Sequence, residues 1–430
     1  MLHVGFGESD ITPKLGAQSP GGMKKRVLNQ VIDPLKAVAM VVKTDDMAVA
    51  LVGVDSLFVT EETVSRARKA IERATSIKGD HVLIGASHTH SGGPVASVFE
   101  SEADPEYVGY VGDKVAEAVA LAWSRMHQSE LGIGTGHEPS IAFNRRFLMR
   151  SGKQVTHPGK GNSEIVHAAG PIDSAVGVLA ARAPGEKGEL FGLFVNFTCH
   201  LTVGRGPGFS ADYVYDLREA LRKYYKKPDL PVGFLLGAAG DVTQVDNLRK
   251  GRESGPEWSA IFGMALAAEV AQAVARMDWR GNAQVEAVRT TVAIPIRDEQ
   301  EVKRQAPELG LGSGNVAEEV YSRERELLAK ERDAHPVIDC EVQAIRVGDL
   351  GIATNGAEFF CQLGLDIKAA SPFPTTWVVS LANQYIGYVA TPSAYYAGGY
   401  EPRTARSAKL APWAGQALVE GALAALQKLD

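Results

Sequence analysis

His81–Pro94 reads HVLIGASHTHSGGP, an apolar run that stops at two histidines, His88 and His90, and continues into Gly92 and Gly93. In an extended segment, side chains two residues apart lie on the same face, so both imidazoles are expected to point the same way. Two imidazoles on one face favour a divalent metal site, and zinc in catalytic use keeps one position open for water. The alternative is a hydrogen-bonded structural histidine, because H-x-H alone is a weak signal.

This run belongs to a set of strand-length apolar segments that indicates an α/β fold. Continuous apolar runs are typical of strands buried on both faces, whereas residues 288–296 alternate as a half-buried strand does. Apolar residues at helical spacing follow several of the runs, as expected for strands that alternate with helices. The runs are AVAMVV (37–42), MAVALVGV (47–54), HVLIG (81–85), LFGLFVNF (190–197) and VGFLLGAA (232–239), and helical spacing covers 214–224, 261–277 and 413–426.

The composition is that of an ordinary globular protein. The chain has 430 residues, of which 45% are hydrophobic and 22% charged, and its net charge of −6 argues against nucleic-acid binding. Three scattered cysteines exclude a disulfide framework. The start, MLHVGFGESDITP, lacks the basic and apolar regions of a secretory signal, and no stretch suggests a membrane span. We therefore expect a cytoplasmic protein without membrane anchoring, either monomeric or homo-oligomeric.

We expect one domain over residues 1–430 with two excursions. Residues 150–172 are rich in Gly, Pro, Lys and His without any period, which predicts a long loop insertion. Residues 297–335 are dense in Glu, Lys and Arg, and AEEVYSRERELLAKERDAH (317–335) predicts a solvated helix. Either segment is a surface excursion or a lid over a site.

Three of the apolar runs end in residues that can carry chemistry. HVLIGA leads to His88 and His90, LFGLFVNF leads to His200, and VGFLLGAA leads to Asp241 and Thr243. In open α/β sheets, ligand sites lie beyond the carboxyl ends of the strands. The sequence therefore predicts that these side chains share one crevice.

Other known site patterns do not fit the sequence. There is no H-E-x-x-H, and Gly92 and Gly93 stand where a metallo-β-lactamase-type H-x-H-x-D-H needs Asp and His. VGRGPGFSAD (203–212) resembles a phosphate loop, but Phe209 replaces the third glycine of a G-x-G-x-x-G. We interpret this segment as a tight turn next to the site.

Five motifs in order resemble the neutral/alkaline, non-lysosomal ceramidases, over most of the chain. GFGESDITP (5–13) and FNRR (143–146) also resemble the broader bacterial group related to them. The five are SHTHSGGP (87–94), NFTCHLTV (196–203), GAAGDVT (237–243), TNGAEFF (354–360) and LANQYIGYVATPSAYYAGGYE (381–401).

The resemblance implies mixed sheets flanked by helices, with one catalytic zinc ion at the strand ends, and hydrolysis of an amide by a zinc-activated water. The zinc ligands it implies are His88, rather than His90, together with His200, Glu358 and Tyr388. Glu358 follows the apolar run of LGIATNGAEFF, and a carboxylate among apolar neighbours needs a partner such as a cation.

A zinc-dependent hydrolase also needs catalytic groups, and the resemblance implies that Tyr400 lies near the reacting carbonyl. His90 would be the general base or would orient a neighbour, and Tyr400 and Arg145 would stabilise the oxyanion. Thr243, with Asp241 in the same segment, replaces the serine of the family's GDVSPN, so that GDVTQVDN keeps a hydroxyl on a stiffer side chain.

Two alternatives to a ceramidase-like zinc hydrolase stay open. One is an amidohydrolase-type barrel, which also uses H-x-H at a strand end; the other is a metal-containing binding protein without catalysis, which the change to Thr243 favours. The family's ceramidases are secreted or membrane-facing and carry an immunoglobulin-like C-terminal domain. This chain shows neither, so we expect a small soluble amide, ester or lactone as substrate.

Overall fold

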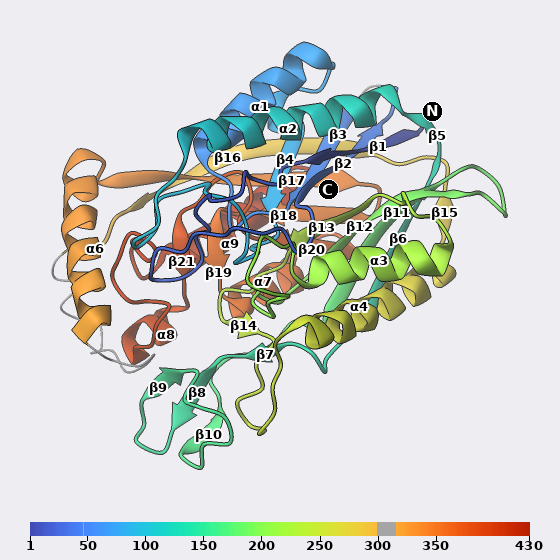
Figure 1. Ribbon diagram of the computed structural model, residues 1–430. Helices are drawn as coiled ribbons and strands as arrows, with labels where there is room; N and C mark the ends of the chain where they lie inside the picture. Colours follow the sequence, from blue (N-terminus) through green and yellow to red (C-terminus); the bar gives the residue numbers. More distant parts are fainter. Residues whose placement is uncertain (46, 299–314) are drawn as a thin grey trace.

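The computed structural model describes residues 1–45, 47–298 and 315–430, which form three larger sheets with helices outside them (Figure 1). In the first sheet, β1 pairs with β2, β2 with β3, and β1 with β5, all antiparallel, whereas β3 and β4 are parallel. Its strand order is β4–β3–β2–β1–β5, with β1 at His3–Asp10, β2 at Lys36–Lys43, β3 at Ala48–Val54, β4 at Val82–Ala86 and β5 at His127–Gln128.

The other two sheets repeat this plan, because each ends in one parallel pair. β12 and β13 are the parallel pair of the second sheet, and β18 and β20 are that of the third. The second sheet has the order β13–β12–β11–β6–β15, with β6 at Glu130–His137, β11 at Ala175–Arg182, β12 at Leu190–Phe197, β13 at Val232–Leu236 and β15 at Trp279–Arg280. The third has the order β16–β17–β18–β20, with β16 at Val285–Pro295, β17 at Val337–Val347, β18 at Leu350–Thr354 and β20 at Thr375–Val379.

A helix joins the two strands of each parallel pair, as a parallel connection requires. α1 (Glu61–Ala74) joins β3 to β4, α3 (Tyr213–Tyr225) joins β12 to β13, and α7 (Cys361–Ala370) joins β18 to β20. The outer faces of the sheets are also covered by α2 (Pro105–Ser124), α4 (Pro256–Arg276) and α9 (Ala414–Gln427).

The central strands are buried on both faces, which explains their continuous apolar sequences. In β2, Ala39 and Val41 pack toward the helices, whereas Val38 and Met40 belong to a core that all three sheets share. That shared core also contains Phe194 of β12, Ile345 of β17 and Trp377 of β20. The α/β class predicted from the sequence is confirmed, and the three open sheets exclude an amidohydrolase-type barrel for the described part of the chain.

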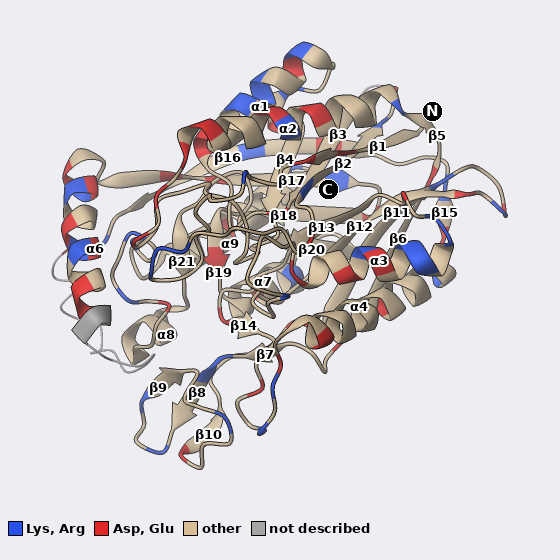
Figure 2. Ribbon diagram, viewed as in Figure 1, with Lys and Arg blue, Asp and Glu red and all other residues tan. Residues whose placement is uncertain are grey.

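Smaller elements lie around the sheets. Where the sequence predicted a long loop at 150–172, the structure has part of a three-stranded antiparallel sheet, at the bottom of Figure 1. The charged segment forms the helix α6 (Asn315–Ala334), along which Figure 2 shows both acidic and basic residues. The helix is not solvated throughout, because Tyr321, Glu324 and Leu328 are buried, and 299–314 of the predicted excursion lies outside the described residues. The remaining elements are η1 (Gly79–His81), β7 (Phe143–Asn144), β8 (Arg146–Met149), β9 (Gln154–Thr156), β10 (Ile165–Ala168), β14 (Val242–Thr243), β19 (Ala357–Phe359), β21 (Gly387–Val389) and α8 (Pro392–Ala397).

One helix corrects the prediction that no stretch has the character of a membrane span. α4 is long and apolar enough to cross a membrane, with a mean hydropathy of 1.4 over 18 residues, of which 39% are buried. In the structure this helix lies on β6 and β11 and buries Phe262, Leu266 and Val270 against them and α3. Other apolar residues of the helix, such as Ile261 and Met264, are exposed, so packing accounts for only part of its apolar composition.

A buried ion pair fixes the end of β3. Asp55 follows β3 and accepts two hydrogen bonds from Arg218 of α3, at 2.5 and 3.0 Å, and one from the backbone of Lys36 at 2.8 Å. Both charged side chains are almost inaccessible. The ion pair thus connects the end of β3 in the first sheet to α3 of the second sheet. The next residues, Ser56–Phe58, contribute to the candidate site, so the pair also holds that part of the site in place.

We predict that Arg218→Leu lowers the free energy of unfolding by about 3–5 kcal/mol, because it leaves the buried Asp55 carboxylate without its counter-charge. Chemical denaturation measures the change. The matched control is Arg66→Leu, which breaks a bidentate pair of the same type with the exposed Asp113 and should change stability little. Equal losses in the two variants would contradict the prediction.

Candidate active site

The candidate site lies where the three parallel strand pairs end. His88 follows β4, His200 follows β12, and Glu358 lies on β19, just after β18. The carboxyl ends of parallel strands are the usual place for ligand sites in α/β proteins, and here three such ends meet. The strand ends therefore bring these side chains to one point.

Three histidines form the centre of the site. The ring nitrogens that His88, His90 and His200 offer all lie within 4.8 Å of one another. Each Nδ1 is held by a backbone carbonyl: that of Leu57 at 2.8 Å, of Gly21 at 2.7 Å and of Ala239 at 2.7 Å, respectively. Because a carbonyl only accepts, each Nδ1 carries the hydrogen, and in the neutral rings each Nε2 keeps its lone pair for a metal ion.

His88 and His90 converge, but not through an extended backbone. His88 has φ of 72°, in the left-handed region that non-glycine residues rarely adopt. The two Nε2 atoms are 3.3 Å apart, with the rings edge to face. The sequence thus predicted the convergence correctly and the backbone that produces it wrongly.

Glu358 supplies a carboxylate oxygen to the same point. Its Oε2 lies 3.2 Å from Nε2 of His88 and 3.5 Å from Nε2 of His200. The side chain is buried, and among the described residues no donor makes a hydrogen bond of good geometry to Oε2. A buried carboxylate oxygen and two imidazole nitrogens meet at one point, and this donor set fits a metal ion.

The protonation states agree with metal binding. Burial and then the Arg145 guanidinium lower the pKa of His200 to about 4, and burial lowers the pKa of His90 well below its usual value. Burial alone would raise the pKa of Glu358, but His88 and His200 outweigh it and hold that pKa well below its usual range. At neutral pH His90 and His200 are therefore neutral and Glu358 is ionised, the states in which they bind a metal.

Tyr388 lies beside Glu358, as the resemblance implied. The two residues are register partners on the parallel strands β21 and β19. The Tyr388 hydroxyl oxygen accepts a hydrogen bond from Nη2 of Arg145 at 3.1 Å. Burial and then the Glu358 carboxylate raise the pKa of Tyr388 well above its usual value, so the phenol is protonated at neutral pH.

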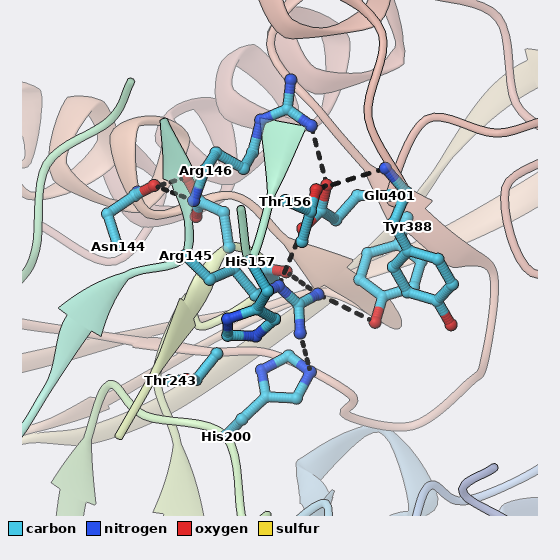
Figure 3. A network of polar contacts seen from close by, with 12 residues as sticks. Asn144, Arg145, Arg146, Thr156, His157, His200, Thr243, Tyr388 and Glu401 are labelled. Atoms are coloured by element: carbon cyan, nitrogen blue, oxygen red, sulfur yellow. Dashed lines mark hydrogen bonds and ion pairs between the residues drawn. The ribbon is translucent and has the colours of Figure 1, made fainter. Parts of the chain in front are cut away.

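Arg145 is a buried member of the site (Figure 3), although two successive arginines could have been solvated. Its Nε donates to Glu401 at 2.8 Å and its Nη2 to the carbonyl of Gly240 at 2.7 Å. Its Nη1 lies 3.4 Å from Nε2 of His200, next to the point that the histidines share. The second arginine, Arg146, is also buried and donates to the other oxygen of Glu401 at 2.7 Å.

Tyr400 completes an aromatic side of the site. Its ring centroid lies 5.8 Å from that of Tyr388 and 5.9 Å from Cζ of Arg145. Its backbone nitrogen is held by the hydroxyl of Thr156, which in turn donates to Glu401. The small sheet β8–β9–β10 thus supports the site from below instead of forming a free loop.

Thr243 and Asp241 follow β13 but face different partners. Thr243 is buried, and Figure 3 shows its side chain beside the rings of His157 and His200. Its Oγ1 accepts a hydrogen bond from the backbone of Val245 at 3.0 Å. The Asp241 carboxylate instead accepts from Asn144 at 2.7 Å and from the backbone of Cys361 at 2.8 Å, so it links the FNRR segment to the start of α7.

Three contributors to the site were missed in the sequence. Tyr385 donates to Oε1 of Glu358 at 3.1 Å, Glu401 joins the two arginines, and Leu57 supplies a carbonyl to His88. Tyr385 and Glu401 lie inside the motif 381–401, so their positions were visible there. A backbone carbonyl carries no sequence signal, and Leu57 could not have been found.

The fold is that of the ceramidases. A solved structure described as a ceramidase complexed with C2 superposes with a TM-score of 0.77 at 17% identity, over 99% of this chain and 75% of that one. The neutral ceramidase from Pseudomonas aeruginosa gives 0.76 at 17% identity, over 100% and 75% of the two chains. No protein-family description and no curated protein sequence matches the chain. The ceramidase-like architecture predicted from the motifs is therefore confirmed.

We predict that Glu401→Gln destabilises the protein in a pH-dependent way. Burial alone would raise the pKa of Glu401, but Arg145 and Arg146 outweigh it and lower that pKa to about 2. Ionised Glu401 therefore stabilises the fold above about pH 4.5, and this contribution is lost as the pH falls toward 2. The variant should be less stable by about 3 kcal/mol at pH 7, and this deficit should narrow by about 1 kcal/mol at pH 4. Denaturation curves at both pH values measure it, and a deficit independent of pH would refute the assignment.

Proposed function

We propose that this protein is a zinc-dependent hydrolase that cleaves an amide bond. The single observation that carries the proposal is Oε2 of Glu358, a buried and unpartnered carboxylate oxygen that faces the Nε2 atoms of His88 and His200. The ceramidase fold supports hydrolysis of an amide rather than another use of such a site.

The donor set supports zinc, one ion per chain, over harder cations. His88, His200 and Glu358 would hold the ion, with Tyr388 as the fourth ligand. Calcium and magnesium prefer oxygen ligands alone, whereas imidazole with one carboxylate is typical of zinc. When bound, zinc would polarise the substrate carbonyl and lower the pKa of a water molecule toward neutrality.

Other side chains of the site would carry out the remaining steps of the reaction. His90 is neutral with Nε2 free of a hydrogen, so it can take a proton from the attacking water at that atom. The Arg145 guanidinium and the neighbouring Tyr400 hydroxyl are donors that would stabilise negative charge on the carbonyl oxygen. Thr243 would hydrogen-bond the water and orient it.

A small soluble amide is our proposed substrate, with esters and lactones as alternatives. A panel of N-acyl amides, esters, lactones and ceramide vesicles separates these classes. Turnover of none of them would favour the non-catalytic binding protein. Cytoplasmic location and homo-oligomer formation stay predictions.

Metal analysis tests the proposal directly. We expect near-stoichiometric zinc in the purified protein, loss of hydrolysis with a chelator, and recovery when zinc is added back. His200→Ala should abolish zinc retention and activity while the fold survives, because a chain of this size has enough core without the ion. A metal-free preparation with full activity would exclude the proposal.

Variants of Thr243 distinguish two possible roles of its hydroxyl. If it only orients the water, Thr243→Ser keeps activity, and the nearly isosteric Thr243→Val loses about 10- to 1,000-fold in turnover, as for other single polar contacts to a reacting group. We expect this outcome, because the Nδ1 of His200 bonds a carbonyl and its Nε2 is directed to the proposed metal position, so this ring is not free to act as a base for Thr243. An acylated peptide containing Thr243 in rapidly quenched reactions would instead show a covalent nucleophile.

A further inference from the structure

Tyr385 touches the Glu358 carboxylate on the side away from the histidines. The hydroxyl of Tyr385 donates to Oε1 of Glu358 at 3.1 Å, since an ionised carboxylate can only accept. The other oxygen, Oε2, faces His88 and His200. The two oxygens therefore have different surroundings: Oε1 accepts a hydrogen bond from a phenol, whereas Oε2 faces the two imidazole nitrogens without a hydrogen bond.

The Tyr385 ring is fixed by a stack with Phe58. The two ring centroids are 3.8 Å apart and the planes differ by 5°, while Phe58 itself is almost fully buried. On the side of its backbone, the neighbouring Asn383 is tied to Ile84 of β4 by two hydrogen bonds, at 2.8 and 2.9 Å. The phenol therefore reaches Glu358 from a rigid position, with little freedom to turn away.

The segment Ser56–Phe58 connects this stack to His88. The carbonyl of Ser56 accepts from the backbone nitrogen of His88 at 2.9 Å, and the carbonyl of Leu57 holds Nδ1 of the same residue at 2.8 Å. The Ser56 hydroxyl donates to the carbonyl of Phe58 at 2.8 Å and keeps the segment in shape. One short segment after β3 thus orients His88 directly and Glu358 through the Phe58–Tyr385 stack.

We propose that Tyr385 is a positioning residue that restricts Glu358 to a single ligating oxygen, Oε2. The inference rests on the proposed metal site and goes beyond it, because it assigns Tyr385, the first tyrosine of the NQYIGY stretch, a task different from that of Tyr388. With Oε1 occupied by the phenol, a metal ion meets one carboxylate oxygen, and a coordination position stays open for water and substrate. Hydrogen bonds to ligating carboxylates commonly change metal affinity by about 10- to 100-fold.

The test is Tyr385→Phe, which removes only the hydroxyl and keeps the ring on Phe58. We expect zinc affinity, measured by competition with a chromophoric chelator, to fall about 10- to 100-fold. In the cobalt-substituted protein, we expect the visible absorption to weaken, because freeing Oε1 allows the carboxylate to bind through both oxygens and raises the coordination number. The matched control is Tyr107→Phe, which removes a buried hydroxyl that donates to the carbonyl of Ile11 at 2.5 Å and should leave both readings unchanged.

A second variant tests the stack. Phe58→Leu keeps the phenol but loosens it, so it should lower zinc affinity less than Tyr385→Phe does. The two changes act through one contact, so the loss in the double variant should be smaller than the product of the single losses. If Tyr385→Phe does not fold, an unchanged affinity in Phe58→Leu overturns the inference by itself.

The outcomes distinguish this inference from the proposed function. A wild-type protein that binds neither zinc nor cobalt overturns both. If the wild-type protein binds both metals, but Tyr385→Phe has an unchanged zinc affinity and an unchanged cobalt spectrum, the positioning role is overturned. The hydrolase proposal is not affected by that result.

Discussion

A buried carboxylate oxygen that lacks a donor, Oε2 of Glu358, is the constraint around which the candidate site is built. Burying such a group costs several kcal/mol unless an opposite charge compensates. His88 and His200 lie beside this oxygen and hold the pKa of Glu358 well below its usual range, whereas the nearest guanidinium, that of Arg145, is engaged by Glu401, Gly240 and Tyr388. This oxygen lies where three parallel strand pairs end, and a cation bound at that point would compensate its charge.

The architecture explains how distant residues reach that point. Each sheet contributes one parallel pair, and each pair sends its following segments to the same place. The first sheet gives Ser56–Phe58 and His88, the second gives His200 and Thr243, and the third gives Glu358 and Tyr385. No single sheet could hold the site, so the core shared by the three sheets is also what keeps the ligands in register.

The sequence predicted the parts of the fold that have the strongest patterns. All five continuous apolar runs are strands, because burial on both faces leaves little freedom in residue choice. Strands such as β1 were not identified, since glycines interrupt their apolar pattern. Gly5 and Gly7 stand where α2 crosses, and a Cβ there would lie 2.0 and 2.2 Å from helix carbonyl oxygens. That requirement comes from tertiary packing and is invisible in a local pattern.

The site was predictable to a similar degree. His88, His90 and His200 were found from strand ends, whereas Glu358 and Tyr388 depended on the resemblance, because one acid or tyrosine among many has no local signal. The roles of the site residues were harder to predict from the sequence than their positions. Asp241 has the sequence context of a catalytic acid, yet both its oxygens are bound by Asn144 and Cys361, and only the structure shows it.

The charge balance of the site gives a physical reason for joining two arginines through one glutamate. Arg145 and Arg146 contribute two positive charges and Glu401 and Glu358 two negative ones, whereas His90, His200 and Tyr388 contribute none at neutral pH. The charges of the two arginines and the two glutamates therefore balance, which limits the cost of burying them. A divalent cation bound by the same residues leaves a net positive charge beside the Arg145 guanidinium. Such a field favours negative charge developing on a carbonyl oxygen over the neutral ground state, which is what the hydrolysis of an amide needs.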